Sequence, residues 1–224
     1  MSGGGVLRWS DYRAMPWRNG GGTTREVASG VMPGAGSGVR GPGESAPGAR
    51  AGAAAHGADA AGADAAGADA FDWRVSIADV GAGGPFSVFA GIDRVITLVE
   101  GSGMVLTVGS GAPRPVEPLT PFAFPGDAPT DCRLEAGAVR DMNVMTRRGR
   151  ATGHVRVMRV GDGGTELTGA ADEIVFAVAV TEGVTLDKEG TAVPLGRLDC
   201  VRATPRLVLR GEGTVAEIRI APVR

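Results

Sequence analysis

Residues 71–80 read FDWRVSIADV, and their side chains alternate between apolar and mostly polar types. The apolar positions are Phe71, Trp73, Val75 and Ile77, and between them stand Asp72, Arg74, Ser76 and Ala78. A period of two is typical of a β-strand with one face on a core and the other in solvent. The stretch therefore predicts a half-buried strand, and it favours a mainly β fold.

Similar short runs continue to the end of the chain. RVITLV (94–99) and MVLTV (104–108) flank Glu100-Gly101-Ser102-Gly103, whose glycines permit positive φ, and they predict a hairpin. The further β-like runs are PFAF (121–124), DCRL (131–134), VRDMNVMT (139–146), HVRVMRV (154–160), EIVFAVAV (173–180), RLDCVRA (197–203), RLVLR (206–210) and VAEIRI (215–220). Pro and Gly separate them at the spacing of β-sandwiches and barrels. Helical periodicity is almost absent, and only WSDYRAM (9–15) suggests a single turn.

The chain divides into two β-rich parts and one stretch of different composition. Residues 30–70 carry few large apolar side chains and include the repeat GADAAGADAAGADA, so they predict a disordered surface insertion that also contains His56. We expect a first domain over residues 1–148 and a second, smaller one over residues 149–224. The second is short for an independent barrel, so sharing of strands with the first is left open.

Composition and charge indicate a globular protein without a strongly charged surface. The 224 residues carry a formal net charge of −2, with 43% hydrophobic and 21% charged residues. This balance gives no reason to expect nucleic acid or an anionic membrane as partner. Because neither a signal peptide nor a membrane-spanning run is recognisable, we expect a cytoplasmic protein. Cys132 and Cys200 are the only cysteines, neither belongs to a CxxC pattern, and we expect both to be unpaired thiols.

The stretch MPWRNGGGTTREVA (15–28) contains a glycine triplet that raises the question of phosphate binding. A Walker loop needs a Lys after the glycines and a helix behind them, and a dinucleotide loop also opens a helix. Here Gly20, Gly21 and Gly22 lead into the strand-like run TTREV. We therefore expect no nucleotide site, and we interpret the triplet as the start of an edge strand that runs close to a neighbour or a ligand.

A metal centre is not expected either. His154 is the single histidine outside the insertion, so a multi-histidine site cannot be assembled within one chain. His154 itself is interpreted as an ordinary strand residue. We expect no metal and no other cofactor.

Strand parity in VRDMNVMTRR (139–148) groups four polar or mixed side chains on one face. Asp141, Asn143, Met145 and Arg147 share that face, and Met142 and Val144 lie on the other. Such a mixture suits either the solvent side of a sheet or a small-ligand site, and parity alone leaves both open.

Together these stretches resemble the HutD/Ves family of the cupin superfamily. The resemblance is carried by MPWRNGGGTTREVA, FDWRVSIADV, GPFSVFAGIDRVITLVEGSGM (84–104) and FAFPGDAPTDCRLEAGAVRDMNVMTRRG (122–149). It implies an RmlC-like bicupin, with two jelly-roll β-barrels in one chain. It also implies a regulatory or accessory role in bacterial histidine utilisation. The insertion departs from the family pattern by its length and repeats.

Comparison with metal-binding cupins places other residues where their ligands would lie. The Glu position falls at or beside Arg94, the two His positions fall near Ser87 and Phe89, and the later His position falls near Thr130 or Asp131. The resemblance therefore implies a lost metal site with a permanent cation in its place. A guanidinium matches a carboxylate or phosphate, so a small anionic metabolite is the expected partner. The expected ligand-binding residues are Trp17, Asn19, Thr23, Arg94, Asp141, Asn143 and Met145.

Three functions compete at this point. A regulator would bind an anionic intermediate of histidine breakdown without turnover, whereas a metal-independent isomerase or hydrolase would use Asp141 or Asp131 as general base. A scaffold for protein contacts is the third alternative, and Arg94 could also serve in a structural salt bridge. The sequence favours the regulator, so we expect no catalytic residue. It leaves open whether identical chains associate.

Overall fold

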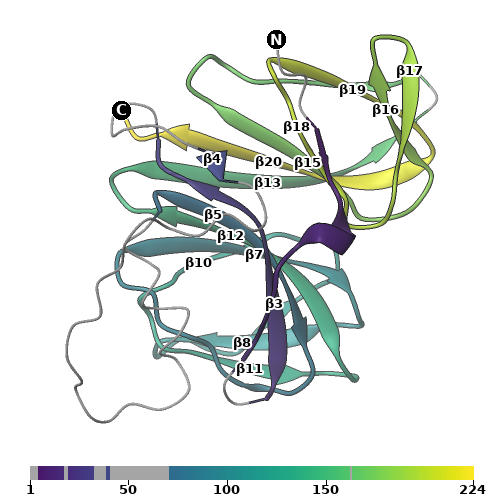
Figure 1. The fold of residues 1–224 in the computed structure, drawn as a ribbon. Helices are drawn as coiled ribbons and strands as arrows, with labels where there is room; N and C mark the ends of the chain where they lie inside the picture. The colour runs from purple at the N-terminus through teal and green to yellow at the C-terminus, as the bar shows by residue number, and fades with distance from the viewer. Residues whose placement is uncertain (1–4, 18–19, 33–38, 41–70, 162) are drawn as a thin grey trace.

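The computed structural model describes residues 5–17, 20–32, 39–40, 71–161 and 163–224. Four β-sheets are stacked on one another in this part of the chain (Figure 1). Each half of the molecule contributes one inner sheet and one outer sheet, and the two inner sheets pack back to back.

The first inner sheet has the order β10-β7-β12-β5-β3-β2, and β4 also pairs with β3. Its strands are β2 (Ala14–Pro16), β3 (Gly22–Gly30), β4 (Val39–Arg40), β5 (Trp73–Val80), β7 (Ile92–Glu100), β10 (Phe122–Pro125) and β12 (Val139–Arg147). The first outer sheet has the order β6-β11-β8-β9. Its strands are β6 (Gly84–Pro85), β8 (Met104–Val108), β9 (Arg114–Val116) and β11 (Thr130–Leu134).

The second half repeats this arrangement with shorter connections. Its inner sheet has the order β1-β18-β15-β20-β13, and its outer sheet has the order β14-β19-β16-β17. The inner strands are β1 (Val6–Leu7), β13 (Ala151–Val160), β15 (Ile174–Ala179), β18 (Cys200–Arg202) and β20 (Gly213–Pro222). The outer strands are β14 (Thr165–Thr168), β16 (Val184–Lys188), β17 (Thr191–Leu195) and β19 (Arg206–Gly211).

In the described part of the chain, hydrophobic cores fill the interfaces between neighbouring layers. Between the inner sheets, Trp73, Val75 and Ile77 pack against side chains such as Phe176 and Ile218. Further cores lie between the inner and outer sheet of each half. The strand of residues 73–80 is therefore buried on both faces, and the expectation of a half-buried strand is wrong, because a second layer covers the side that carries Arg74 and Ser76.

The predicted hairpin between residues 94–99 and 104–108 does not form. β7 pairs with β10 and β12, whereas β8 pairs with β9 and β11 in the facing sheet. Gly101 and Gly103 have φ of 100° and 141°, as predicted, but they turn the chain from one layer to the next. The hydrogen-bonded ladders leave the facing sheets separate, so the expected closure into two barrels is not confirmed, whereas the mainly β fold is.

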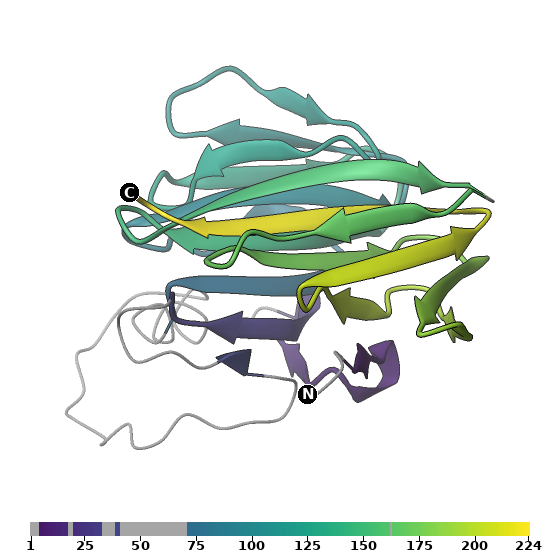
Figure 2. The ribbon, with the colours of Figure 1, turned by 90° about the horizontal axis from the view of Figure 1, so that it is seen from above.

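The N-terminal segment connects the two halves along one side of the stack (Figure 2). β1 pairs with β18 in the second half, and β2 pairs with β3 in the first. Between them lies the predicted single turn, a 3₁₀ helix η1 (Trp9–Asp11). The proposed domain division at residue 148 remains a prediction.

The insertion expected at residues 30–70 lies mostly outside the described residues, and so does His56. Within it, β4 (Val39–Arg40) forms a short ladder with the end of β3, so the expectation of a loop is wrong at those two positions.

The glycine triplet lies at the turn between β2 and β3. Gly20 has a φ of 70°, and the backbone N–H of Trp17 donates to the carbonyl of Gly22 at 2.9 Å. The interpretation of the triplet as the start of an edge strand is wrong, because β2 folds back and covers the outer side of β3. The close approach that glycine allows is nevertheless present at Gly22. A Cβ atom there would overlap the carbonyl oxygen of Asp79 and lie 3.0 Å from the Trp17 ring.

Gly22→Ala is accordingly expected to lower the free energy of unfolding by about 1–3 kcal/mol, because the rigid backbone of Asp79 has to move. Gly161→Ala is the matched control, since a Cβ at Gly161 meets nothing within 4 Å. Urea unfolding of the two variants measures the difference. Equal stability of both variants would contradict the close approach.

Candidate functional site

A cluster of buried polar side chains lies on the face of the first inner sheet that looks toward the first outer sheet. Register places Met145 of β12 between Arg74 of β5 and Arg94 of β7. Asn143 and Asp141 follow along β12 on the same face. We call these five residues the inner cluster. Parity had left the solvent side and a ligand site open, and burial of Asp141, Asn143 and Met145 to 2–8% exposure excludes the solvent side.

Arg94 is the central cation of the inner cluster, and it is only 6% exposed. Its guanidinium carbon lies 4.9 Å from the ring centroid of Phe124, 5.3 Å from that of Phe86 and 5.5 Å from that of Phe89. These distances fall in the range of cation–π attraction. Its Nε donates to Oδ1 of Asn143 at 3.4 Å. Aromatic rings thus surround the charge in a region of low dielectric.

Asp141 is the buried acid next to this cation. Its Oδ1 has no hydrogen-bond partner within the described part of the chain. Burial, opposed by the positive charge of Arg94 and supported by the negative charge of Asp79, raises the pKa of Asp141 to about 7. Near neutral pH both the neutral and the charged form of this carboxyl group are therefore populated.

A second charged pair was missed by the sequence reasoning. Arg74 is 6% exposed, and its Nε lies 3.0 Å from Oε2 of Glu26 on β3. Ser29 Oγ donates to the other oxygen of that carboxylate at 2.9 Å. Alternation in residues 71–80 put Arg74 and Ser76 on one face, and that signal would have found the pair if the face had been recognised as interior.

The structure brings together four of the seven expected ligand-binding residues, namely Arg94, Asp141, Asn143 and Met145. Trp17 packs at the edge of the same core, and its Nε1 donates to Thr24 Oγ1 at 2.8 Å. Thr23 lies on the opposite face of β3 from the buried Thr24, because neighbouring strand residues alternate. Asn19 lies outside the described residues.

His, Cys and Asp side chains also lie outside the inner cluster. Within the described ranges, no three His, Cys, Asp or Glu side chains are grouped so as to hold a metal ion. Cys132 and Cys200 are free, buried thiols, as expected, and burial raises the pKa of Cys132 to about 12. His154 is an exposed residue of β13, which agrees with its interpretation as an ordinary strand residue. Asp131 is exposed, unlike Asp141.

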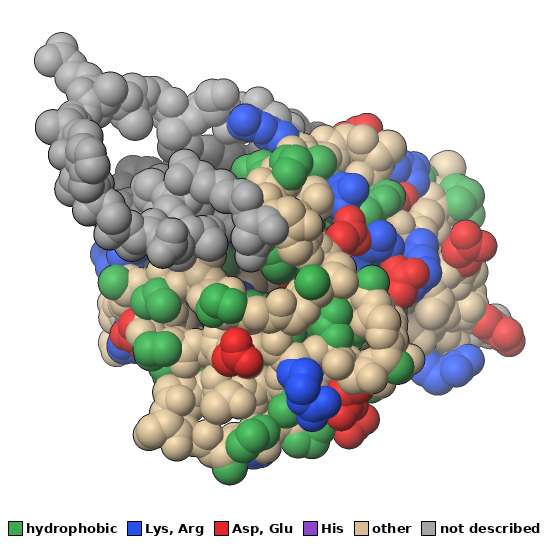
Figure 3. Space-filling model, turned by 90° about the horizontal axis from the view of Figure 1, so that it is seen from below, with side chains coloured by type: hydrophobic (Ala, Val, Ile, Leu, Met, Phe, Trp, Pro, Cys, Tyr) green, Lys and Arg blue, Asp and Glu red, His purple; other side chains and the backbone are tan. Residues whose placement is uncertain are grey.

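The face shown in Figure 3 carries acidic and basic side chains interspersed with one another, not gathered into a patch of one sign. The helical part of the described chain contains nothing long and apolar enough to cross a membrane.

The titration of Asp141 predicts how stability depends on pH. The folded-state pKa of about 7 lies above the ordinary value of 3.8, so between these values the folded protein holds a proton that the unfolded chain has released. Stability from this group is therefore fully present below about pH 4 and is lost as pH rises toward 7, by at most about 1.4 kcal/mol per pH unit. Asp141→Asn is expected to flatten the curve over that range in urea unfolding, whereas Asp131→Asn, at the exposed control site, is expected to leave it unchanged. A curve of the same slope in the Asp141 variant would contradict the raised pKa.

Comparison with known proteins identifies the family. The HutD family model matches residues 57–217. The chain belongs to the HutD/Ves family. An uncharacterized 21.2 kDa protein in the hutC 3′ region of Pseudomonas putida is 34% identical over 198 residues, which cover 88% of this chain and 85% of that protein. Protein Ves of Citrobacter koseri is 32% identical over 155 residues, with 67% of this chain and 63% of that protein covered.

Solved structures support the same family and the fold. HutD from Pseudomonas fluorescens SBW25 superposes with a TM-score of 0.70 at 30% identity, over 99% of this chain and all of that one. YhhW from Escherichia coli superposes with a TM-score of 0.60 at 8% identity over 99% of both chains, a likeness of fold alone. The HutD/Ves chain is thus mainly β and shares the fold of these solved structures.

Proposed function

We propose that this HutD/Ves protein binds a small anionic metabolite at the inner cluster and acts as a regulatory or accessory protein in histidine utilisation. The observation that carries the proposal is the buried guanidinium of Arg94, which three phenyl rings and Asn143 hold in place. A guanidinium presents paired N–H donors that match a carboxylate. In a buried environment the attraction between the two charges is stronger than in water.

The neighbouring acid supports an anion as ligand. A fully charged Asp141 would repel an anion near Arg94, but burial raises its pKa to about 7, so its neutral form is well populated near that pH. In that form its O–H can donate a hydrogen bond to a carboxylate. Asn143 supplies an amide for orientation, and Met145 and Phe89 supply apolar contacts.

The link to histidine utilisation rests on the relatives. One relative is named for its position in the hutC 3′ region, and a solved relative is named HutD. The candidate ligands are therefore anionic intermediates of histidine breakdown, namely urocanate and the N-formimino and N-formyl derivatives of glutamate. We further propose that each pair of facing sheets corresponds to a cupin jelly roll, which would make the chain a bicupin divided near residue 148. We also propose that the protein is cytoplasmic.

A thermal-shift screen followed by titration calorimetry tests the binding proposal. A ligand at 100 times its Kd should stabilise the folded state by about 2.7 kcal/mol. Imidazole, which lacks the carboxylate of urocanate, is the control for that ligand, and glutamine, which carries no net charge, is the control for the two glutamate derivatives. EDTA in parallel samples tests for a metal requirement. The proposal predicts saturable binding of at least one of the three anions that EDTA does not change. Absence of binding by all three would contradict it.

A second candidate function is a metal-independent isomerase or hydrolase with Asp141 as general base. The observation that favours it is the same raised pKa, because a base with a pKa near 7 is matched to neutral pH. Product formation from the bound anion, followed by NMR, distinguishes the enzyme from the regulator. For an enzyme, Asp141→Asn should abolish turnover while binding persists, whereas a regulator shows no turnover in either protein.

A further inference from the structure

A concave site lies at the seam between the two halves, away from the inner cluster. We call it the seam cleft, and its volume is about 470 Å³. Leu98, Glu100 and Leu119 line it from the first half, and Val180, Glu182 and Arg197 line it from the second. A cleft of this size, between two packed units, is of the kind that holds small molecules.

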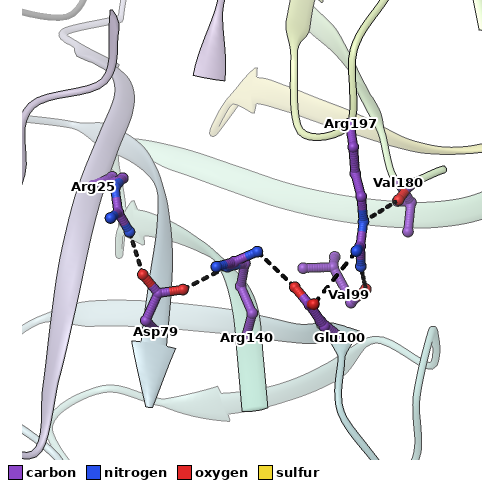
Figure 4. Close-up of polar contacts among 7 residues, drawn as sticks. All are labelled: Arg25, Asp79, Val99, Glu100, Arg140, Val180 and Arg197. Carbon is purple, nitrogen blue, oxygen red and sulfur yellow. Dashed lines mark hydrogen bonds and ion pairs between the residues drawn. The ribbon is translucent and has the colours of Figure 1, made fainter. Parts of the chain in front are cut away.

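The walls of the seam cleft are fixed by a chain of ion pairs that crosses the seam (Figure 4). Arg197 donates from Nε to the carbonyl of Val180 at 3.1 Å and from one terminal nitrogen to that of Val99 at 3.2 Å. Its other terminal nitrogen lies 3.4 Å from Oε1 of Glu100. Arg140 holds the second oxygen of Glu100 at 2.6 Å and continues the chain to Asp79 and Arg25. The site is therefore held in shape without a ligand.

Leu119 at this cleft is in an unusual state. It is 38% exposed, and its φ of 61° lies in the left-handed region that bulky residues rarely adopt. Its backbone N–H donates to the carbonyl of Leu98 at 2.9 Å, which holds the strained conformation in place. Exposure and strain both cost free energy without improving the core. Such a residue points to a function at the cleft.

The charges of the seam cleft favour a cation. All three nitrogens of Arg197 are directed at protein acceptors, and Glu100 is bound by two arginines. Glu182 is different, because its carboxylate makes no hydrogen bond or ion pair with the described residues. Glu182 therefore supplies a negative charge that no arginine of the described chain neutralises, next to the exposed side chains of Pro118 and Leu119.

We propose that the seam cleft binds a small organic cation, an amine or guanidine with an apolar body. The apolar body lies against Pro118 and Leu119, and the cationic group pairs with Glu182. This site is separate from the inner cluster and takes a ligand of the opposite charge.

Phenethylamine and its matched anion 3-phenylpropionate test the proposal on the full chain, with titrations followed by amide NMR. Phenethylamine is expected to shift the signals of residues 98–101 and 180–182 and to saturate, whereas 3-phenylpropionate is expected to leave them unshifted. Glu182→Gln should weaken amine binding about three- to fivefold, the size of an exposed ion pair. Leu119→Gly should weaken it about fivefold while the fold persists, because glycine suits a positive φ.

Two controls keep the result specific. Val88→Ala changes another exposed apolar residue and should leave amine affinity unchanged. Arg94→Met should also leave it unchanged, so failure of the inner cluster and failure of the seam cleft can be told apart. Absence of saturable shifts at the seam, equal binding of both probes, or full affinity in Glu182→Gln would overturn the proposal.

Discussion

Trp73→Ala is expected to lower the free energy of unfolding by about 3–5 kcal/mol, the largest stability effect anticipated for a single substitution in this protein. Trp73 is fully buried between the two inner sheets, and its ring centroid lies 5.7 Å from that of Phe176. Removal of the indole leaves a cavity between two layers whose β-sheets cannot collapse onto it. Because the substitution removes packing that joins the halves, a single transition in the wild type is expected to become broader or to split in the variant.

Two further variants define the cause of that loss. Trp73→Phe is expected to cost much less than alanine, since it keeps most of the ring volume and removes the indole N–H, which is buried without a hydrogen-bond partner among the described residues. Val88→Ala, at a residue 42% exposed, should change stability by no more than about 0.5 kcal/mol. Urea unfolding followed by circular dichroism measures all three. A loss below about 1 kcal/mol in Trp73→Ala would show that this core does not hold the layers together.

Arg94→Met is expected to weaken binding of the anionic ligand by about 30- to 1000-fold, the second large effect. Loss of one partner of a buried charged pair costs about 2–4 kcal/mol, which corresponds to that range. Methionine fills a similar volume among Phe86, Phe89 and Phe124, and without the cation the pKa of Asp141 rises further, so the acid becomes neutral. The variant is therefore expected to stay folded.

Arg114→Met is the matched control for this experiment. Arg114 also lies over a phenyl ring, at 6.0 Å from the centroid of Phe122, but it is exposed. Its replacement should leave affinity unchanged in titration calorimetry with the anion that the screen selects. Unchanged affinity in Arg94→Met, with the fold intact, would remove the inner cluster from the proposed function.

Much of the fold followed from local pattern. Alternation and turn residues predicted strands that the structure confirms, such as β12 and β20, and they predicted the positive φ of Gly101 and Gly103. The β14, β16 and β17 strands were not predicted. They are short and interrupted by polar residues, and a weak period of two in four or five residues does not separate a strand from a loop.

The candidate site was predictable in part, for a similar reason. Parity along VRDMNVMTRR grouped Asp141, Asn143 and Met145, and the family resemblance singled out Arg94. Arg74 and Glu26 were missed, because a charged residue in an alternating strand is normally assigned to the solvent side. Their strands lie between two other layers, and that is a property of the stack.

The sequence by itself determined the β-rich class, the family, and which side chains of each strand share a face, because these depend on residue type and on the two-residue period of a strand. Only the tertiary structure decided which faces are interior, that β7 and β8 belong to different sheets, and that Glu100 and Arg197 meet across a seam. These relations depend on how the sheets are stacked. Strand periodicity is the same whether a face meets water or another layer, so local pattern cannot distinguish the two.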